Sequence, residues 1–450
     1  MSKFEELRNK YPEVIYNNYQ IEEKDNQLII TYEFITPSLD SFHPTIKFNK
    51  AIIKNKNIDN NLLNYIVFHI GLIELISYYK PTCSPQITIK CGYLNKNQIK
   101  WYKKLLYHGL EELFYVNKIN IKMDELVTIN CECINKPVFS DDYNGSGNLI
   151  PIGGGKDSCV SLEILKNEND NSCFIINPKK PSLDCAYVAG YKEEDILCVE
   201  RNLDKKMVEL KDKGFINGHT PFSAIVAFIS YLCAYLSNKK YVLISNESSS
   251  NEPTVKNSTI NHQYSKSFEF EKDFDKYVHK YFKIDLNYVS LLRGLSEYHI
   301  GYLFSKYEKY HKVFRSCNLG SKSSDWKWCC NCPKCLFVYI VLSPHLHKEK
   351  LINIFGEDLF ERKDLLKTFI EIIGESEVKP FDCVGTTAEA KYAISKLINR
   401  LDKNDLPYLL KYYYENYDLS LNSEKIMKYN KKNNLNKHFN DLVLEEINNK

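Results

Sequence analysis

The sequence lacks the features that direct a chain to a membrane or out of the cell. Its first residues, Met1-Ser2-Lys3-Phe4-Glu5-Glu6, do not form a basic segment followed by an apolar one, so we expect no signal peptide. No apolar run approaches the roughly 20 residues that a helix needs to cross a bilayer. The longest apolar stretches, 65–78 and 221–236, are interpreted as buried helices. We therefore expect a cytoplasmic protein with no membrane partner.

The sequence also has little excess charge of either sign. Its 450 residues contain 60 Lys and Arg against 57 Asp and Glu, which gives a net charge of +3. Binding to nucleic acid depends on a concentrated positive surface, so we expect no nucleic-acid partner. No internal repeat is visible. The length predicts two or three domains, and hydrophobic residues, 44% of the total, are sufficient to form a core in each.

Cysteine is plentiful, but its pattern argues against disulfides. The chain has 15 cysteines, an odd number, and no export signal accompanies them. This combination favours reduced thiols or metal ligands over a disulfide framework. Ten of them are scattered, and we interpret these as small buried apolar side chains. The other five lie close together between residues 317 and 335.

The pattern of apolar residues predicts three regions. Residues 1–145 are predicted to form an N-terminal α+β domain, with strands at 27–34, 45–48 and 127–134 and helices at 60–79 and 97–114. Residues 146–315 are predicted to form an α/β domain. Residues 316–450 are predicted to contain a Cys-rich zinc loop and a helical C-terminal region.

The predicted α/β domain alternates short apolar runs with helical stretches. Its predicted strands are 149–152, 173–177, 196–200, 241–245 and 287–292, and its predicted helices are 159–166, 203–211, 221–236 and 266–282. Nearly continuous apolar strands are typical of a sheet that is covered on both faces. The alternation therefore predicts a parallel sheet with helices on both faces.

The most informative motif is a Gly-rich junction between a predicted strand and a predicted helix. It reads Gly153-Gly154-Gly155-Lys156-Asp157-Ser158. Glycines let a phosphate approach the backbone closely, and the N-terminus of the next helix presents unpaired N–H groups and the positive end of its dipole. Lys156 adds a charge, Ser158 adds a hydroxyl, and Asp157 adds a carboxylate that can reach Mg²⁺ on phosphate oxygens. We predict that ATP binds here; the alternative is a simple Gly-rich turn.

This motif does not have the spacing of a Walker loop. It resembles the pyrophosphate loop, Ser-Gly-Gly-x-Asp-Ser, of the ATP pyrophosphatase superfamily, whose members cleave ATP between the α and β phosphates and form adenylates. The resemblance implies a Rossmann-like fold. Gly153 departs from the pattern, because it replaces the first serine and removes one hydroxyl donor. In that superfamily the end of the second strand often contacts adenine or ribose, which implies such a role for Asn177; a plain strand-ending turn is the alternative.

The cysteine cluster has the spacing of a metal site. Cys329, Cys332 and Cys335 are each separated by two residues, and Cys317 lies upstream. Four thiolates suit tetrahedral Zn²⁺ with Zn–S distances of about 2.3 Å, so we predict a closed, structural zinc site. A redox pair or an iron–sulfur cluster are the alternatives, and Cys330 could replace a neighbouring ligand. A similar arrangement occurs in 7-cyano-7-deazaguanine synthases, which also carry the pyrophosphate loop.

Candidate catalytic residues lie in three polar segments. His219 precedes the helix at 221–236, Glu247 directly follows the strand at 241–245, and His262, Tyr264 and Lys266 precede another predicted helix. Ligands of open α/β sheets bind beyond the carboxyl ends of the strands, so Glu247 is a candidate contact for magnesium or ribose. The other residues offer proton-transfer and anion-binding groups. The alternatives are a capping role for His219 and solvent-exposed charges at Glu247 and Lys266.

Taken together, these segments closely resemble the ATP-dependent epimerases of UDP-N-acetylmuramoyl-L-alanyl-L-glutamate, which are enzymes of bacterial cell-wall synthesis. The matching stretches are 153–158, 217–221, 245–248, 261–271, 314–318, 328–335 and 380–385. The resemblance thus covers most of residues 150–385. It implies an isomerase that uses ATP and acts on a UDP-muramoyl dipeptide in peptidoglycan synthesis and hence in cell shape. Cys330 departs from the pattern, which has a small residue there.

The implied reaction suits these residue types. Adenylation removes the negative charge of the glutamate carboxylate, so that a base can take the Cα proton; reprotonation on the other face and hydrolysis complete the reaction. His219, His262 and Lys266 are the candidate acids and bases.

Two rival functions stay open. One is another adenylating enzyme of the same fold that modifies a nucleobase precursor or tRNA, and the other is a zinc-stabilised scaffold that binds ATP without turnover.

Overall fold

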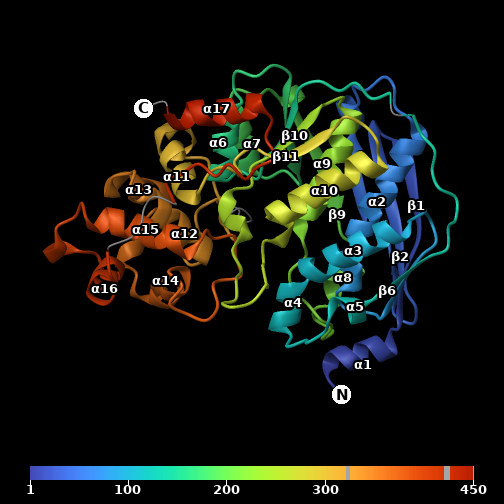
Figure 1. The fold of residues 1–450 in the computed structure, drawn as a ribbon, viewed down its shortest axis with the longest axis horizontal. Helices are drawn as coiled ribbons and strands as arrows, with labels where there is room; N and C mark the ends of the chain where they lie inside the picture. Colours follow the sequence, from blue (N-terminus) through green and yellow to red (C-terminus); the bar gives the residue numbers. More distant parts are fainter. Residues whose placement is uncertain (141, 321–324, 420–425, 449–450) are drawn as a thin grey trace. The chain divides into compact units, whose positions relative to one another are not determined.

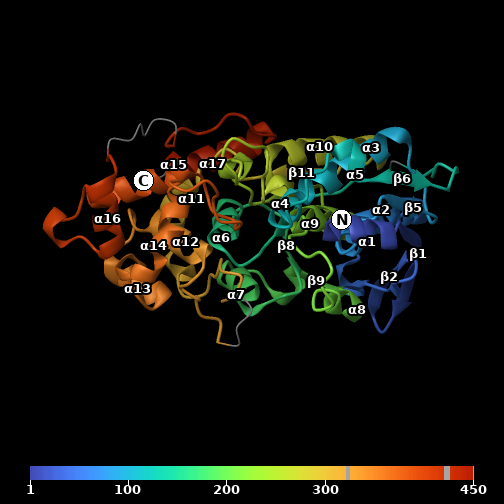
Figure 2. The same cartoon turned by 90° about the horizontal axis from the view of Figure 1, so that it is seen from below.

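The computed structural model describes residues 1–140, 142–320, 325–419 and 426–448 (Figure 1, Figure 2). The chain forms two compact units, each built from segments that are distant in sequence. The first unit consists of residues 1–149, 197–242 and 273–288, and the second consists of residues 150–196, 243–272 and 289–450. Strands β7 (Asn148–Pro151), β10 (Tyr241–Ile244) and β11 (Asn287–Ser290) begin in the first unit and end in the second.

The first unit is built on a mixed sheet with the strand order β9-β4-β2-β1-β5-β6, and β3 pairs with β2. Its strands are β1 (Glu13–Lys24), β2 (Gln27–Thr36), β3 (Asp40–Phe42), β4 (Thr45–Asn49), β5 (Gln86–Ile89), β6 (Thr128–Cys131) and β9 (Ile196–Asn202). β1, β2 and β4 pair antiparallel, whereas β1, β5 and β6 pair parallel. In β2 every second side chain is buried, so one face of this strand contributes to the core.

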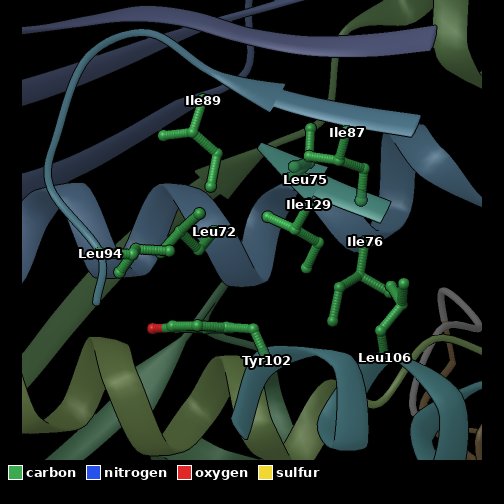
Figure 3. Close-up of a pocket in the computed structure, with 9 residues that line it drawn as sticks. All are labelled: Leu72, Leu75, Ile76, Ile87, Ile89, Leu94, Tyr102, Leu106 and Ile129. Atoms are coloured by element: carbon green, nitrogen blue, oxygen red, sulfur yellow. The ribbon is translucent and has the colours of Figure 1, made fainter. Parts of the chain in front are cut away.

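Helices of the first unit cover this core. They are α1 (Lys3–Lys10), α2 (Asn60–Tyr79), α3 (Lys96–Gly109), α4 (Glu111–Val116), α5 (Met123–Leu126), α8 (Lys205–Glu209) and α9 (Phe222–Leu236), with the 3₁₀ helix η1 (Lys50–Ile52). α2 packs against β1, β2 and α9. Figure 3 shows a small cavity in this unit whose lining is mainly apolar: Leu72, Leu75, Ile76, Ile87, Ile89, Leu94, Tyr102, Leu106 and Ile129.

The central helix α2 confirms the helix predicted at 60–79. It has 20 residues, and the Asp59 side chain caps its start by accepting the N–H groups of Asn61 and Leu62. Within the described residues it is long and apolar enough to cross a membrane, and the expectation that no stretch approaches that length was wrong. However, 94% of its apolar stretch is buried inside the protein, as expected for a core helix.

The second unit is predominantly helical around its short strands. Besides the ends of β7, β10 and β11 it contains the strand β8 (Asn171–Ile176). Its α-helices are α6 (Lys156–Ile164), α7 (Lys180–Val188), α11 (Glu297–Lys306), α12 (Pro333–Leu342), α13 (Lys348–Phe355), α14 (Leu366–Ile372), α15 (Thr387–Ile398), α16 (Tyr408–Asn416) and α17 (Lys437–Asn448). Its 3₁₀ helices are η2 (Glu193–Asp195), η3 (Ser248–Asn251), η4 (Tyr264–Lys266), η5 (Glu308–Tyr310), η6 (Leu359–Glu361), η7 (Lys363–Leu365) and η8 (Lys403–Asp405). Helix α10 (Phe268–Tyr281) begins in this unit. α12 packs against α11, α14 and α15 (Figure 1).

The α/β class and the five strands predicted between residues 149 and 292 are confirmed, with shifted ends. The predicted parallel sheet is confirmed only in part, because the sheet is mixed. β7 and β10 pair parallel, but β9 pairs antiparallel with β4, with Phe48 opposite Val199. The sequence of a strand does not reveal which strand it pairs with or in which direction, because either direction satisfies its backbone hydrogen-bonding groups. The sequence analysis also missed β1, which pairs with β2 through a tight turn in which Asp25 and Asn26 have positive φ.

Candidate active site

The Gly-rich junction lies in the second unit, between β7 and α6, as the sequence indicates. Gly154 has φ +81°, and a Cβ atom there would lie 2.7 Å from the backbone N of Ser182. Only glycine therefore fits this position without strain. Gly153 is exposed, and a Cβ atom there would meet nothing within 4 Å. The junction thus combines a tightly packed glycine with open space directly before a helix N-terminus.

Replacement of Gly154 by alanine is expected to destabilise the protein by about 1–3 kcal/mol. The new Cβ would combine a left-handed backbone with a clash against the backbone of Ser182. Gly190→Ala is the matched control, because Gly190 also has a positive φ, +98°, but has open space around its Cβ position. Thermal unfolding of both variants measures the difference. Equal losses of stability would contradict the role assigned to the close contact.

Two hydroxyl groups border the junction. The Ser158 hydroxyl donates to the Gly155 carbonyl over 2.9 Å. The Ser316 Oγ lies 2.9 Å from the position of a Gly155 Cβ atom, and this buried oxygen has no hydrogen-bond partner among the described residues. A buried hydroxyl without a partner is costly, so Ser316 is suited to donate to a ligand oxygen. It is a further hydroxyl at the junction, beside Gly155.

Three carboxylates meet beside the junction. Asp157 lies on the first turn of α6, Glu247 follows β10, and Glu297 is the first residue of α11. An oxygen of each lies within 4.8 Å of those of the other two. The fully buried ammonium of Lys156 binds both Asp157 and Glu297. The backbone N–H of Glu297 donates to Glu389 over 2.8 Å, which fixes the start of α11.

The charges in this cluster shift two pKa values in opposite directions. Burial, followed by the negative charges of Asp157 and Glu247, raises the pKa of Glu297 to about 7, although Lys156 opposes the shift. Burial alone would raise the pKa of Asp157, but the charges of Lys156 and Lys334 lower it below its ordinary value. A further cation would favour the ionised form of all three carboxylates. The arrangement is therefore suited to a divalent metal ion with oxygen ligands.

A buried arginine connects the segments that carry Glu247 and Lys266. The Arg293 side chain is fully buried and pairs with Glu271, Nη2 to Oε2 at 2.9 Å. Its Nη1 donates to the Glu247 carbonyl over 2.6 Å, and its Nη2 donates to the Lys266 carbonyl over 2.7 Å. Arg293 thus positions two candidate residues through their backbones and needs no contact with a ligand.

Lys266 faces a cysteine that the sequence analysis did not single out. Its Nζ donates to the Cys383 Sγ over 3.0 Å. His262 lies on the same side, with its ring centroid 6.4 Å from that of Phe381. Tyr264 is buried and packs against Phe270, with centroids 6.2 Å apart. Lys266, His262 and Tyr264 therefore stay predictions for roles in the site.

Two of the predicted site residues remain to be described, each within its own unit. His219 belongs to the first unit, where its Nδ1 lies 3.8 Å from Glu112 Oε2. Asn177 belongs to the second unit; it follows β8, is exposed and has φ +49°. Both therefore stay predictions for roles in the site.

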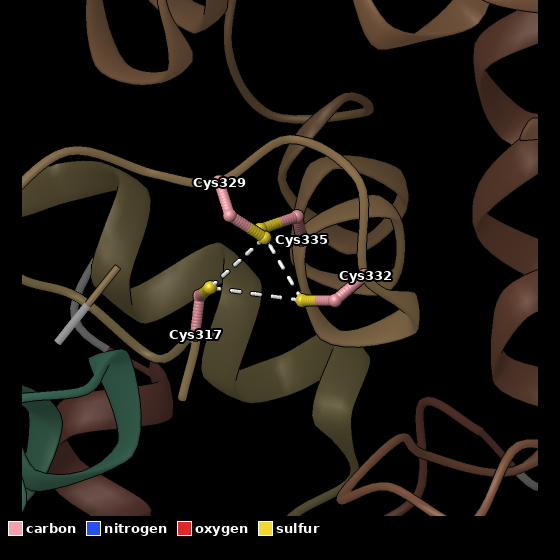
Figure 4. A group of neighbouring side chains, drawn as sticks. All are labelled: Cys317, Cys329, Cys332 and Cys335. Carbon is pink, nitrogen blue, oxygen red and sulfur yellow. Dashed lines mark hydrogen bonds between the residues drawn. The ribbon is translucent and has the colours of Figure 1, made fainter. Parts of the chain in front are cut away.

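The four cysteines predicted to bind metal come together in the second unit (Figure 4). The Sγ–Sγ distances are 3.2 Å for Cys317–Cys329, 3.7 Å for Cys317–Cys332 and 3.5 Å for both Cys332–Cys335 and Cys329–Cys335. This cluster could hold a metal ion. Cys330 takes no part, because it has φ +54° and its thiol donates to the Phe355 carbonyl over 3.2 Å.

Comparison with known proteins decides the family. The model of the MurL N-terminal domain matches residues 5–291, and that of the MurL C-terminal domain matches residues 313–426. The chain belongs to the MurL family. Relatives named UDP-N-acetyl-alpha-D-muramoyl-L-alanyl-L-glutamate epimerase occur in Xanthomonas oryzae pv. oryzae, Micromonospora sp. and Salinispora tropica. Each relative is 32% identical to this chain. The alignments cover 74%, 74% and 75% of this chain, in that order, and 74% of each relative. Epimerases are isomerases, so this MurL-family chain is an enzyme of that class.

No solved structure matches the chain in the comparison made. The geometry of this MurL-family site therefore comes from the present structure alone. It adds Glu297, Arg293, Lys334 and Cys383 to the residues that the sequence suggested. For Lys334 and Cys383 a signal existed, since they lie in the matching stretches 328–335 and 380–385. For Glu297 and Arg293 no motif marked the positions, because their roles depend on partners far away in the sequence.

Proposed function

We propose that this chain is the ATP-dependent epimerase that converts the terminal L-Glu of UDP-N-acetylmuramoyl-L-alanyl-L-glutamate to D-Glu. The observation that carries the proposal is the open Gly153–Gly155 junction next to the carboxylates of Asp157, Glu247 and Glu297. The substrate follows from the names of the MurL relatives. With this function the protein takes part in peptidoglycan precursor synthesis in the cytoplasm.

ATP is assigned to the Gly-rich junction, in the manner of the ATP pyrophosphatase superfamily. The free space at Gly153 admits a polyphosphate, and the Ser316 hydroxyl supplies a donor that lacks a partner among the described residues. The N-terminus of α6 adds unpaired N–H groups and a favourable dipole. Lys156 and Ser158, on the first turn of α6, are proposed to add a charge and a hydroxyl. Asn177, at the end of β8, is proposed to contact the nucleoside.

Magnesium is assigned to the carboxylates. Three carboxylates within 4.8 Å of one another repel each other unless a cation lies among them, and Lys156 supplies only one positive charge for Asp157 and Glu297. Mg²⁺ prefers one or two carboxylates together with phosphate oxygens. When bound, it would neutralise charge on the polyphosphate.

The proposed reaction has three chemical stages. The α-carboxylate oxygen of the terminal glutamate attacks the α-phosphorus of ATP, and the bond to the β-phosphate breaks with release of pyrophosphate. The resulting mixed anhydride carries no carboxylate charge, so a base can take the Cα proton and leave an enolate. Reprotonation on the other face and attack by water give the D-epimer and AMP. His219, His262, Tyr264 and Lys266 are the proposed groups for proton transfer and charge stabilisation.

The four-cysteine cluster is assigned to structural zinc. The Sγ–Sγ distances of 3.2–3.7 Å suit tetrahedral coordination with Zn–S of about 2.3 Å. Four thiolates leave no open position for a substrate, which favours a structural role. Zinc would fix the start of α12, where Lys334 reaches the Cys383 carbonyl.

Asp157→Asn is expected to lower AMP release and epimerisation by about a hundredfold or more, because a metal ligand and a charge are lost together. The assay mixes the variant, the muramoyl dipeptide, ATP and Mg²⁺ and measures AMP and the chirality of the glutamate. Asp184→Asn is the matched control, since Asp184 lies in the same unit and pairs with Lys180 on the surface. Wild-type-like turnover of Asp157→Asn contradicts the assignment.

A further inference from the structure

The side chain of Cys383 has no role in the reaction as described, yet it lies beside two of the proposed catalytic residues. It accepts a hydrogen bond from the Lys266 Nζ over 3.0 Å and another from the His262 side chain. Lys266 in turn lies within electrostatic reach of Glu247 and Asp157. The thiol is therefore linked through Lys266 to the carboxylates beside the Gly-rich junction, where the proposed adenylation takes place.

The loop that carries Cys383 is held in place from several sides. Val378 pairs with Val255 in an isolated antiparallel bridge, and the Lys379 N–H donates to the Thr254 carbonyl over 2.9 Å. Gln263 Nε2 donates to the Val384 carbonyl over 3.2 Å. The ammonium of Lys334 binds the Cys383 carbonyl. A proton-transfer group must be held rigidly at its position, and these contacts supply that rigidity.

The charges around Cys383 favour the thiolate. Burial alone would raise its pKa, but Lys266, His262 and Lys334 outweigh burial and lower the pKa of Cys383 to about 6. Burial alone would lower the pKa of Lys266, but the charges of Cys383, Glu247 and Asp157 raise it above its ordinary value. These charges therefore favour an ammonium on Lys266 paired with a thiolate on Cys383. An ammonium has no lone pair to accept a proton, whereas a thiolate has one.

We propose that the Cys383 sulfur, activated by Lys266, exchanges the glutamate Cα proton on one face of the substrate. The inference rests on the proposed function. In the forward step the S–H bond forms as the Cα–H bond breaks, and the electron pair of that bond moves onto the carbonyl of the mixed anhydride. The proton that reaches Cα on the opposite face comes from a second group, and the thiol returns its own proton when the reaction runs backward.

The main test measures two partial reactions of Cys383→Ser. Serine keeps the size of the side chain but is not ionised near neutral pH. The variant should retain the exchange of labelled pyrophosphate into ATP in the presence of the dipeptide within about threefold, because adenylation precedes proton transfer. The rate of epimerisation should fall by about a hundredfold or more. Incorporation of deuterium from heavy water at Cα should also be lost for at least one of the two epimers. Cys133→Ser, a half-exposed thiol of the first unit, is the control with unchanged activity.

The outcomes separate this inference from the function on which it rests. If the wild-type protein shows no pyrophosphate exchange, the adenylating function itself fails. If both proteins show the exchange and Cys383→Ser still epimerises and incorporates deuterium within threefold of wild type, only the role of Cys383 is overturned. Loss of deuterium incorporation with retained pyrophosphate exchange supports it, because a merely structural defect would reduce both.

A second measurement uses the unaltered protein, so that it does not depend on the folding of a variant. At pH 7, iodoacetamide should alkylate Cys383 at least about tenfold faster than Cys133, because the thiolate is the reactive form. Peptide mass spectrometry gives both rates. ATP and the dipeptide together should protect Cys383. Alkylation that is no faster than at Cys133, or that substrate leaves unchanged, overturns the proposal.

Discussion

Cys332→Ser is expected to lose the proposed structural zinc and to melt at a much lower temperature than the wild-type protein. Cys332 lies between Cys317 and Cys335 in the four-thiol cluster, at 3.7 Å and 3.5 Å respectively. Structural zinc contributes about 10–16 kcal/mol of apparent binding free energy in small zinc peptides, and much of this free energy would be lost with one ligand. The metal content follows from elemental analysis of the purified protein, and the stability follows from thermal unfolding.

Loss of zinc is also expected to abolish epimerisation. Lys334 lies between two of the ligands and binds the Cys383 carbonyl, so disorder in the metal loop would release the loop that carries Cys383. The neighbouring Cys330→Ser variant is the matched control. Cys330 is also buried, but its thiol contacts the Phe355 carbonyl instead of the cluster, so its variant should keep one zinc ion per chain. Equal zinc content in the two variants would refute the assigned ligand set.

Arg293→Met is expected to destabilise the protein by about 3–5 kcal/mol, because it leaves the Glu271 carboxylate buried without its oppositely charged partner. Both side chains are only 1% exposed, so water cannot replace the lost charge. The backbone carbonyls of Glu247 and Lys266 would each lose the hydrogen bond from Arg293 at the same time. Hydrogen exchange should therefore increase around residues 247–251 and 264–267, and activity should fall together with stability. Thermal unfolding and hydrogen-exchange mass spectrometry measure these effects.

Two controls make this prediction specific. The double variant Glu271→Gln/Arg293→Met removes both charges and should recover part of the lost stability, since no ionised group stays buried alone. Lys180→Met removes a partner from the surface pair Lys180–Asp184, in which Lys180 is 57% exposed, and should cost less than about 1 kcal/mol. A double variant that is no more stable than Arg293→Met would show that the buried charge is not the cause.

Local sequence patterns were sufficient for many of the elements and for the two clearest motifs. The strands β7 and β8, the helix α6 and the glycines between β7 and α6 follow from neighbouring residues, because apolar runs, turns and helix starts are local properties. The same is true of Cys329, Cys332 and Cys335, whose spacing lets consecutive thiolates surround one ion. Cys317 could be added because it lies only a short distance upstream.

Only the tertiary structure decided which distant residues meet. Lys156 pairs with Glu297, 141 positions away, and Lys266 reaches Cys383, 117 positions away. Neither pair has a spacing that a pattern can detect. The pairing of β9 with β4 and the burial of Arg293 against Glu271 depend in the same way on how the chain folds back on itself. The sequence determines which side chains are present. Folding determines which charges lie within a few ångströms of one another, and these charges set the pKa of Cys383 and the partners of the carboxylates.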